Sequence, residues 1–121
     1  MVNSRSKIRA GIIGTGLMGR RRAESLRSFK DVELVAVSSD MAEQAICLAR
    51  DMKCKQAKSW QQLVSRKDID VILVCTPPDC HLPMCAAALE NGKHVLCEKP
   101  LAHNPEEAGI IVKLAHQQGL K

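Results

Sequence analysis

The chain has 121 residues, a length typical of one domain and too short for two of ordinary size. Apolar residues make up 45% and charged residues 26%, a balance that excludes a disordered chain. Lys plus Arg number 18 against 13 Asp plus Glu, and this modest excess is spread along the chain. With one Trp, one Phe and no Tyr, the chain has no aromatic platform for single strands and no nucleic-acid-reading motif. We therefore expect no nucleic-acid partner.

The sequence indicates neither a membrane span nor a disulfide framework. No run approaches the roughly 18 apolar residues that a span needs. The six cysteines include no C-x-x-C pair, and Cys75 and Cys97 lie inside apolar runs, where a thiol acts as a small hydrophobic side chain. Because zinc ligands usually come in close pairs, we expect no metal site. This pattern predicts reduced thiols in a cytoplasmic protein that does not contact a membrane.

The first half of the chain alternates between strand and helix patterns. Ile8–Ile13 and residues 32–37 are β-rich runs, and the second is apolar nearly throughout, as expected of a parallel strand covered on both faces. A helix is predicted after Gly19, with Phe29 on its buried face. Residues 41–52 have the apolar spacing of a second helix.

The second half continues the alternation. A short strand at residues 55–57 precedes Ser59-x-x-Gln62, a capping box for a brief helix. Residues 71–76 form the most hydrophobic run and the best candidate for a central strand. The other predicted elements are a helix over 82–90 that ends at Asn91-Gly92, a strand over 94–97, and a helix that starts at Asn104-Pro105 and runs to 118.

Strands that alternate with helices form a parallel sheet with helices on both faces. We therefore predict an α/β fold of the Rossmann type, a doubly wound parallel sheet of about five strands in a single domain over residues 1–121. Such sheets bind ligands at the carboxyl ends of their strands. The loops expected at that edge start at Gly14, Ser38, Thr76 and Glu98.

A glycine-rich turn follows the first strand. Gly14-Thr15-Gly16-Leu17-Met18-Gly19 fits G-x-G-x-x-G between a strand and a helix. In a dinucleotide site the first glycine permits a tight turn, the second lets the backbone approach the pyrophosphate, and the third lets the helix pack closely. The N–H groups and the positive end of the helix dipole then face the phosphates. We predict dinucleotide binding here; a turn that serves packing alone is the alternative.

The cofactor's identity depends on the loop after the second strand. An acidic residue that binds the ribose hydroxyls is expected about 20 positions after the glycine turn. Ser39 falls there and Asp40 is adjacent, so Asp40 either holds the ribose and repels a 2′-phosphate or caps the helix beginning at Met41. Alternatively, Ser38 and Ser39 with a nearby arginine hold a 2′-phosphate. We predict NAD or NADP, with NAD slightly favoured. The arginines at 20–22 either contact a phosphate or form a solvated helix face.

Two further loops carry candidate site residues. Thr76 and Pro77, after the predicted central strand, are expected near the nicotinamide end of a dinucleotide. His81 opens the next helix, where it either donates to the ligand or serves a capping or packing role. Glu98 and Lys99 follow the fifth strand, and a lysine there can stabilise a developing alkoxide or polarise a carbonyl. A surface lysine is the alternative for Lys99.

Four segments together resemble the Gfo/Idh/MocA family, which includes glucose–fructose oxidoreductase and inositol dehydrogenase. They are G-I-I-G-T-G-L-M-G at 11–19, V-A-V-S-S-D at 35–40, D-V-I-L-V-C-T-P-P-D-C-H at 70–81 and A-L-E-N-G-K-H-V-L-C-E-K-P-L-A at 88–102. The resemblance covers practically the whole chain, and E-K-P-L-A is its most diagnostic part. It implies an NAD(P)-dependent oxidoreductase that transfers a hydride between the nicotinamide and a hydroxyl or carbonyl of a sugar, cyclitol or related substrate.

The resemblance also implies roles for individual residues and a second, substrate-binding domain that these residues do not include. It makes Lys99 the catalytic residue, beside nicotinamide and substrate, with Glu98 and Pro100 positioning it, and we expect the Lys99–Pro100 bond to be cis. The acidic residue common in the family at Ser39 is displaced to Asp40. Family members continue into a larger α/β domain with the catalytic base, most substrate contacts and the oligomer interface. We expect these residues to form the NAD(P)-binding domain, truncated before that substrate domain and catalytically incomplete alone.

Other expectations follow from this incomplete architecture. The free edge of the sheet after the fifth strand predicts marginal stability or pairing with another chain, as in a homo-oligomer. A non-catalytic dinucleotide-binding module, acting as a sensor or scaffold, is the alternative function and predicts nucleotide-dependent partner binding. A β-hydroxyacid-type dehydrogenase domain shares the G-x-G-x-M-G start but does not explain E-K-P.

Overall fold

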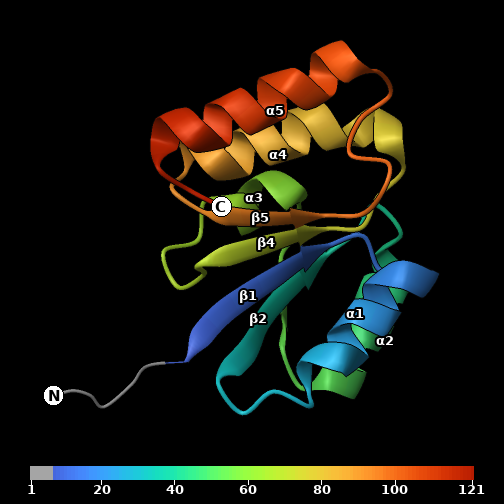
Figure 1. Cartoon of the computed structure of the whole chain (residues 1–121). Coiled ribbons are helices and arrows are strands. Elements are labelled where there is room, and N and C mark those ends of the chain that lie inside the picture. Colours follow the sequence, from blue (N-terminus) through green and yellow to red (C-terminus); the bar gives the residue numbers. More distant parts are fainter. Residues whose placement is uncertain (1–6) are drawn as a thin grey trace, which may run out of the picture.

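The computed structural model describes residues 7–121 as one parallel sheet with helices on both faces (Figure 1), which confirms the predicted fold class. The strand order is β3-β2-β1-β4-β5, and every neighbouring pair is parallel. The strands are β1 (Ile8–Ile13), β2 (Val32–Ser38), β3 (Lys55–Gln56), β4 (Val71–Val74) and β5 (His94–Cys97). The helices are α1 (Leu17–Leu26), α2 (Ala42–Met52), α3 (Trp60–Val64), α4 (His81–Glu90) and α5 (Pro105–Gln118), with a 3₁₀ turn at Pro78–Cys80.

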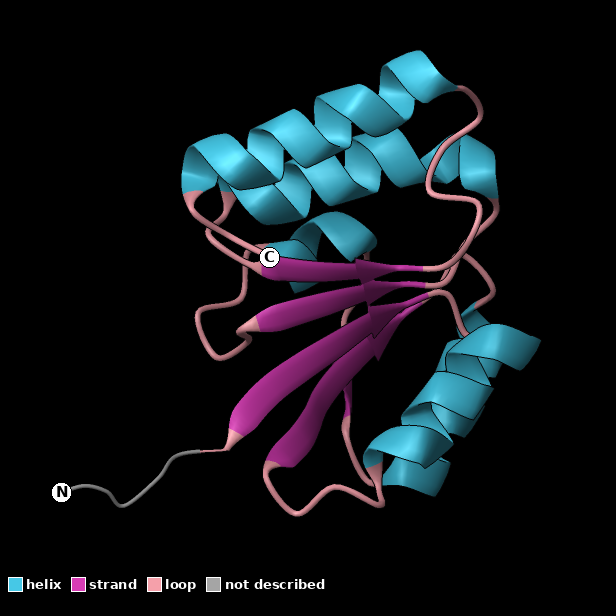
Figure 2. Ribbon diagram, viewed as in Figure 1, coloured by secondary structure: helices cyan, strands magenta, loops and turns pink. Residues whose placement is uncertain are grey.

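The sheet separates two hydrophobic cores. Helices α1 and α2 cover one face, and α3, α4 and α5 cover the other (Figure 2). Because successive strand residues point to opposite faces, Ile12 packs into the first core and Ile13 into the second. Both side chains are almost fully buried, at 0% and 1% exposure. Coverage of both faces explains why the interior strands are continuous apolar runs.

Local capping signals define several helix ends as predicted. Ser59 accepts a hydrogen bond from the Gln62 amide (3.1 Å), and the Gln62 side chain accepts one from the Lys58 amide (3.3 Å). Asn104 accepts from the Glu107 amide (2.8 Å) at the start of α5, and the helix ends at Gly119 in the left-handed conformation, φ 68°. These short polar side chains satisfy amides that the first turn of a helix leaves unpaired.

Three expectations about the elements differ from the structure. Helix α1 begins at Leu17, inside the glycine motif, and ends at Leu26, so Phe29 lies in the following turn. The prediction that Phe29 belongs to a buried helix face is wrong, since its side chain is 58% exposed. The most hydrophobic run, β4, is an interior strand between β1 and β5, but β1 occupies the middle of the sheet.

Candidate functional site

Loops from four strands meet at the carboxyl edge of the sheet, because all five strands are parallel. A cavity of about 390 Å³ opens there, lined by residues that include Gly14, Ser39, Asp40, Trp60 and Thr76. A second cavity, of about 260 Å³, adjoins the glycine turn on the side of α1 and α2 and includes Thr15, Gly16 and Leu17 in its lining. The strand–turn–helix unit thus faces open space along both flanks.

The three glycines of the turn stand in different surroundings. Gly14 has φ 99°, and a Cβ there would lie 2.8 Å from the Cys75 carbonyl oxygen. A Cβ on Gly19 would lie 1.9 Å from the Gly14 oxygen, so α1 leaves the sheet in contact with the turn. A Cβ on Gly16 would meet nothing within 4 Å. The first and third positions therefore serve the turn and its packing, and the second faces free space.

The start of α1 presents unsatisfied polar groups. No side chain caps its N-terminus, where Gly16 is the N-cap. Thr15 is only 6% exposed, and its hydroxyl oxygen is buried without a hydrogen-bond partner among the described residues. Buried polar atoms of native proteins nearly always have a partner, so an orphaned hydroxyl beside free helix amides fits a site for an anionic ligand. These groups suit the pyrophosphate of a dinucleotide.

The loop after β2 leaves Asp40 available to a ligand. Ser39 accepts a hydrogen bond from the Met41 amide (3.0 Å). Met41 is the N-cap of α2, and no side chain caps that helix, so the capping alternative for Asp40 is wrong. Asp40 is exposed and lines the 390 Å³ cavity, as does Lys58 from the loop before α3. A carboxylate and an ammonium thus border the same space.

His81 joins two of the loops from within the protein. Its side chain is fully buried (0% exposed), with Nε2 2.7 Å from the Thr76 carbonyl oxygen. Its Nδ1 lies 2.9 Å from the carbonyl oxygen of Pro100 and 3.1 Å from that of Leu101. Because carbonyl oxygens occupy both ring nitrogens, the structure favours the packing alternative for His81. Thr76 lines the cavity, and Pro77 is exposed at the same edge.

The turn after β5 carries a shielded carboxylate beside an exposed lysine. The Glu98 amide donates to the Val74 carbonyl (2.9 Å), which continues the ladder beyond the strand. The Glu98 side chain is 16% exposed and forms an ion pair with Arg22 of α1, whose guanidinium lowers the pKa of Glu98. Lys99 is exposed and forms no ion pair within residues 7–121. The Lys99–Pro100 bond is cis, as the resemblance implied.

The Arg22–Glu98 pair is a contact that sequence reasoning missed. The two residues are 76 positions apart, and no local pattern connects them. Arg20, which carried the same phosphate or solvent alternatives, forms an ion pair with Asp51 of α2 (3.0 Å). Two of the three consecutive arginines therefore bind carboxylates of other elements, a role that sequence reasoning did not anticipate. Arg20 also lines the 260 Å³ cavity beside the glycine turn, so its contact with a phosphate stays a prediction.

The described residues offer little else that resembles a catalytic or metal centre. All six cysteines are free thiols, and burial raises the pKa of Cys75 to about 12. No group of three or more His, Cys, Asp or Glu side chains in residues 7–121 could hold a metal ion. Over the same residues, no helix has the length and apolar character needed to cross a membrane.

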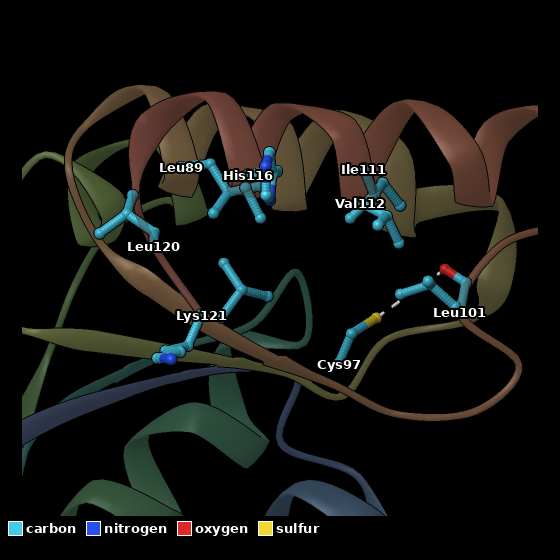
Figure 3. A pocket seen from close by; sticks show the side chains of 10 residues that line it. Leu89, Cys97, Leu101, Ile111, Val112, His116, Leu120 and Lys121 are labelled. Carbon is cyan, nitrogen blue, oxygen red and sulfur yellow. Dashed lines mark hydrogen bonds between the residues drawn. The ribbon is translucent and has the colours of Figure 1, made fainter.

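A third cavity, of about 360 Å³, lies between α5 and β5 and contains none of the predicted site residues (Figure 3). Apolar side chains of the helices, Ile111 and Val112 among them, reach toward Cys97 and Lys121 across it (Figure 3). The Val95 amide donates to the Lys121 carbonyl (3.1 Å), so the last residue lies beside β5. In the described sheet β5 is an edge strand with β4 as its strand neighbour.

A parallel doubly wound sheet whose first strand leads through a glycine turn into a helix defines a dinucleotide-binding Rossmann domain. Residues 8–121 match the family model described as the oxidoreductase family with an NAD-binding Rossmann fold, GFO_IDH_MocA. The chain therefore belongs to the Gfo/Idh/MocA family.

Relatives with assigned activities share this domain. The dTDP-3,4-didehydro-2,6-dideoxy-α-D-glucose 3-reductase of Streptomyces antibioticus is 36% identical over 94% of this chain and 35% of its own length. Inositol 2-dehydrogenase 3 of Saccharopolyspora erythraea is 34% identical over 93% of this chain and 33% of its own. The crystal structure of Synechocystis biliverdin reductase with biliverdin and NADP⁺ aligns with TM-score 0.89 and 33% identity over 93% of this chain and 36% of that one. This chain thus spans about a third of the length of the relatives it matches.

Proposed function

We propose that this chain is the cofactor-binding domain of an NAD(P)-dependent oxidoreductase. The reaction is hydride transfer between the nicotinamide and a hydroxyl or carbonyl carbon of a sugar, cyclitol or related small molecule. The observation that carries the binding is the start of α1, where the open space over Gly16 meets the buried, unpartnered hydroxyl of Thr15. The reaction class rests on the family and on the names of the relatives, which are reductases and dehydrogenases. These names do not favour a non-catalytic sensor or scaffold.

The site divides among the loops at the carboxyl edge. Gly14–Gly19 takes the pyrophosphate, with the amides that begin α1 and the Thr15 hydroxyl as donors. Thr76 and Pro77 border the nicotinamide end, where the buried His81 ring lies within hydrogen-bond distance of the Thr76 and Pro100 carbonyl oxygens. In this assignment His81 is a positioning residue that does not touch the cofactor.

Lys99 is the proposed catalytic group of this domain. Its ammonium is exposed at the ligand edge and can donate a hydrogen bond to the substrate oxygen. That donation stabilises negative charge on the oxygen as its proton leaves. The bound dinucleotide supplies the hydride acceptor or donor. The proton itself needs a base, which we assign to a part of the enzyme beyond these residues.

We further propose a preference for NAD over NADP. Asp40 is exposed on the cavity wall next to Ser39, and its carboxylate can accept hydrogen bonds from both ribose hydroxyls. A 2′-phosphate placed there would meet a like charge. Lys58 borders the same cavity and opposes this preference, because its ammonium attracts a phosphate. The Asp40 contact is favoured because Asp40 stands two residues after the end of β2, in the loop where we place the ribose.

The remaining proposals concern the protein's surroundings. Six free thiols suit a reducing compartment, which supports a cytoplasmic location. In the described sheet β5 is an edge strand whose Val95 amide donates to the Lys121 carbonyl, and we propose that this edge also pairs with a second chain in a homo-oligomer.

The sole tryptophan provides a direct test of binding. Trp60 lines the cavity that also contains Ser39 and Asp40, so bound NADH should quench its emission and gain fluorescence by energy transfer. We expect saturable transfer that excess NAD or ADP-ribose reverses, whereas adenine alone does not. Calorimetric titration with NAD and with NADP checks the result without a fluorophore. The proposal fails if neither nucleotide gives transfer or heat at concentrations up to about 1 mM, which corresponds to about 4 kcal/mol of binding free energy.

A further inference from the structure

We propose that Arg22 is a positioning residue of the site: it binds the Glu98 carboxylate and thereby leaves the Lys99 ammonium unpaired for the ligand. This inference rests on the proposed function of Lys99 and extends it to a residue of α1. Its central observation is the ion pair between the Arg22 guanidinium and Glu98, in which the two side chains are 39% and 16% exposed. The ion pair connects the helix of the glycine turn to the turn after β5.

The charges of two basic side chains act on the Glu98 carboxylate. One is Lys99, its neighbour in the chain, and the other is Arg22 from across the sheet edge. The structure pairs Glu98 with Arg22 and leaves Lys99 without an ion pair among residues 7–121. The largest cause of the lowered pKa of Glu98 is likewise its hydrogen bond to Arg22, and the charge of Lys99 contributes less.

The arrangement determines which cation faces the ligand. A guanidinium is the better partner for a half-shielded carboxylate, since its planar N–H groups match the carboxylate and it stays charged at all relevant pH values. If Arg22 were absent, the nearest cation left for Glu98 would be Lys99. The lysine would then satisfy the carboxylate of its own turn and lose donors that a substrate oxygen needs.

The pair also fixes the turn itself. The Glu98 amide is bonded to the Val74 carbonyl (2.9 Å), and the carbonyl of Pro100 is bonded by the His81 ring (2.9 Å). Arg22 adds a side-chain anchor from the opposite face of the sheet, because α1 and α4 lie on different faces (Figure 2). The backbone on both sides of Lys99 is thus held from both faces, and its side chain is the exposed group.

The test measures how fast an amine-specific acylating reagent modifies Lys99, with peptide mapping by mass spectrometry and exposed Lys113 as internal reference. An amine paired with a carboxylate stays protonated more often and reacts more slowly. We expect R22Q to slow Lys99 relative to Lys113 roughly two- to fivefold, the range for a pair near the surface. In R22K the ratio of the Lys99 to the Lys113 modification rate should equal that of the parent, and in R22Q/E98Q the ratio should return to the parental value.

Several outcomes would overturn the inference. The inference is contradicted if R22Q is folded, as judged by circular dichroism, and its Lys99 to Lys113 rate ratio equals that of the parent. It is also contradicted by an R22Q/E98Q protein in which Lys99 stays slow, since no carboxylate then remains at 98 to pair with it. Should R22Q not fold, E98Q alone decides: an acceleration of Lys99 by twofold or more shows that Lys99 already shares Glu98 in the parent.

Adding NADH separates this inference from the proposed function. If the domain binds the cofactor as proposed, NADH slows the modification of Lys99 in the parent but not that of Lys113. Loss of this protection in the parent counts against the cofactor site, whereas the variant ratios without nucleotide test Arg22 alone.

Discussion

Two glycines only three positions apart should respond in opposite ways to the same added methyl group. In Gly19→Ala the new Cβ would lie 1.9 Å from the Gly14 carbonyl oxygen, a backbone atom that no rotamer change can move. Real contacts of this kind stay above 3.0 Å, so α1 and the turn must separate by roughly 1 Å. Overpacking of this size costs about 1–3 kcal/mol, or about 4–12 °C in Tm for a domain of this length.

Gly16→Ala is the matched variant. Its Cβ would meet no atom within 4 Å, and φ is −74°, a value that alanine adopts without strain. We expect the free energy of unfolding to stay within about 1 kcal/mol of the parent, because reduced unfolded-state entropy offsets a slightly poorer N-cap. In the proposed complex, however, the methyl group occupies the space where the pyrophosphate approaches. We expect at least a tenfold loss of NADH affinity, about 1.4 kcal/mol.

Thermal unfolding by circular dichroism and NADH titration through Trp60 fluorescence measure the two effects on the same samples. We expect Gly16→Ala to be stable but to bind NADH weakly, and Gly19→Ala to be unstable. If the Gly16 variant binds NADH as the parent does, the pyrophosphate does not lie over that residue. If the Gly19 variant melts with the parent, the close approach of α1 to the turn is wrong.

Four further predictions test the site and the fold. Thr15→Val should leave thermal stability unchanged, since it removes an orphaned hydroxyl, but should weaken NADH binding about fivefold in the fluorescence titration. Asp40→Asn should raise the affinity for NADP relative to NAD by calorimetry, because it removes the like charge beside a 2′-phosphate; an unchanged ratio would place the ribose elsewhere. Lys93→Met should lower the free energy of unfolding, measured in urea, by about 1–3 kcal/mol. The buried Lys93 ammonium donates to the carbonyl oxygens of Ile69 (2.8 Å) and Arg66, and both oxygens would lose this partner. The hydrogen bond from Arg9 lowers the pKa of Asp70 in the folded protein. The ionised carboxylate therefore stabilises the fold at pH values above about 3.9, the pKa of an aspartate in the unfolded chain. This stabilisation is lost as the pH falls through the lower pKa of the folded state. Asp70→Asn should therefore reduce the urea midpoint at pH 6 more than at pH 2, and equal losses at both would contradict the linkage.

The order of the elements and the place of the glycine turn followed from local patterns. Strand β1 has the boundaries predicted from its apolar run, and α5 begins and ends at the residues its capping signals indicated. These features can be predicted from the sequence because a strand, a cap or a glycine turn depends on residues within a few positions of one another. The resemblance added the family and the cis Lys99–Pro100 bond, neither of which the periodicity of the chain contains.

Only the tertiary structure decided the partners of the charged and buried polar side chains. The ion pair of Arg22 with Glu98 exists because the order β1-β4-β5 places α1, which follows β1, within side-chain reach of the turn after β5, across 76 residues of chain. The sequence is compatible with His81 as a ligand-binding or as a packing residue, and the three carbonyl oxygens around its ring favour packing. Hydrophobic spacing encodes which face of an element is buried, but a hydrogen bond between distant loops depends on strand order and on the exact approach of two backbones.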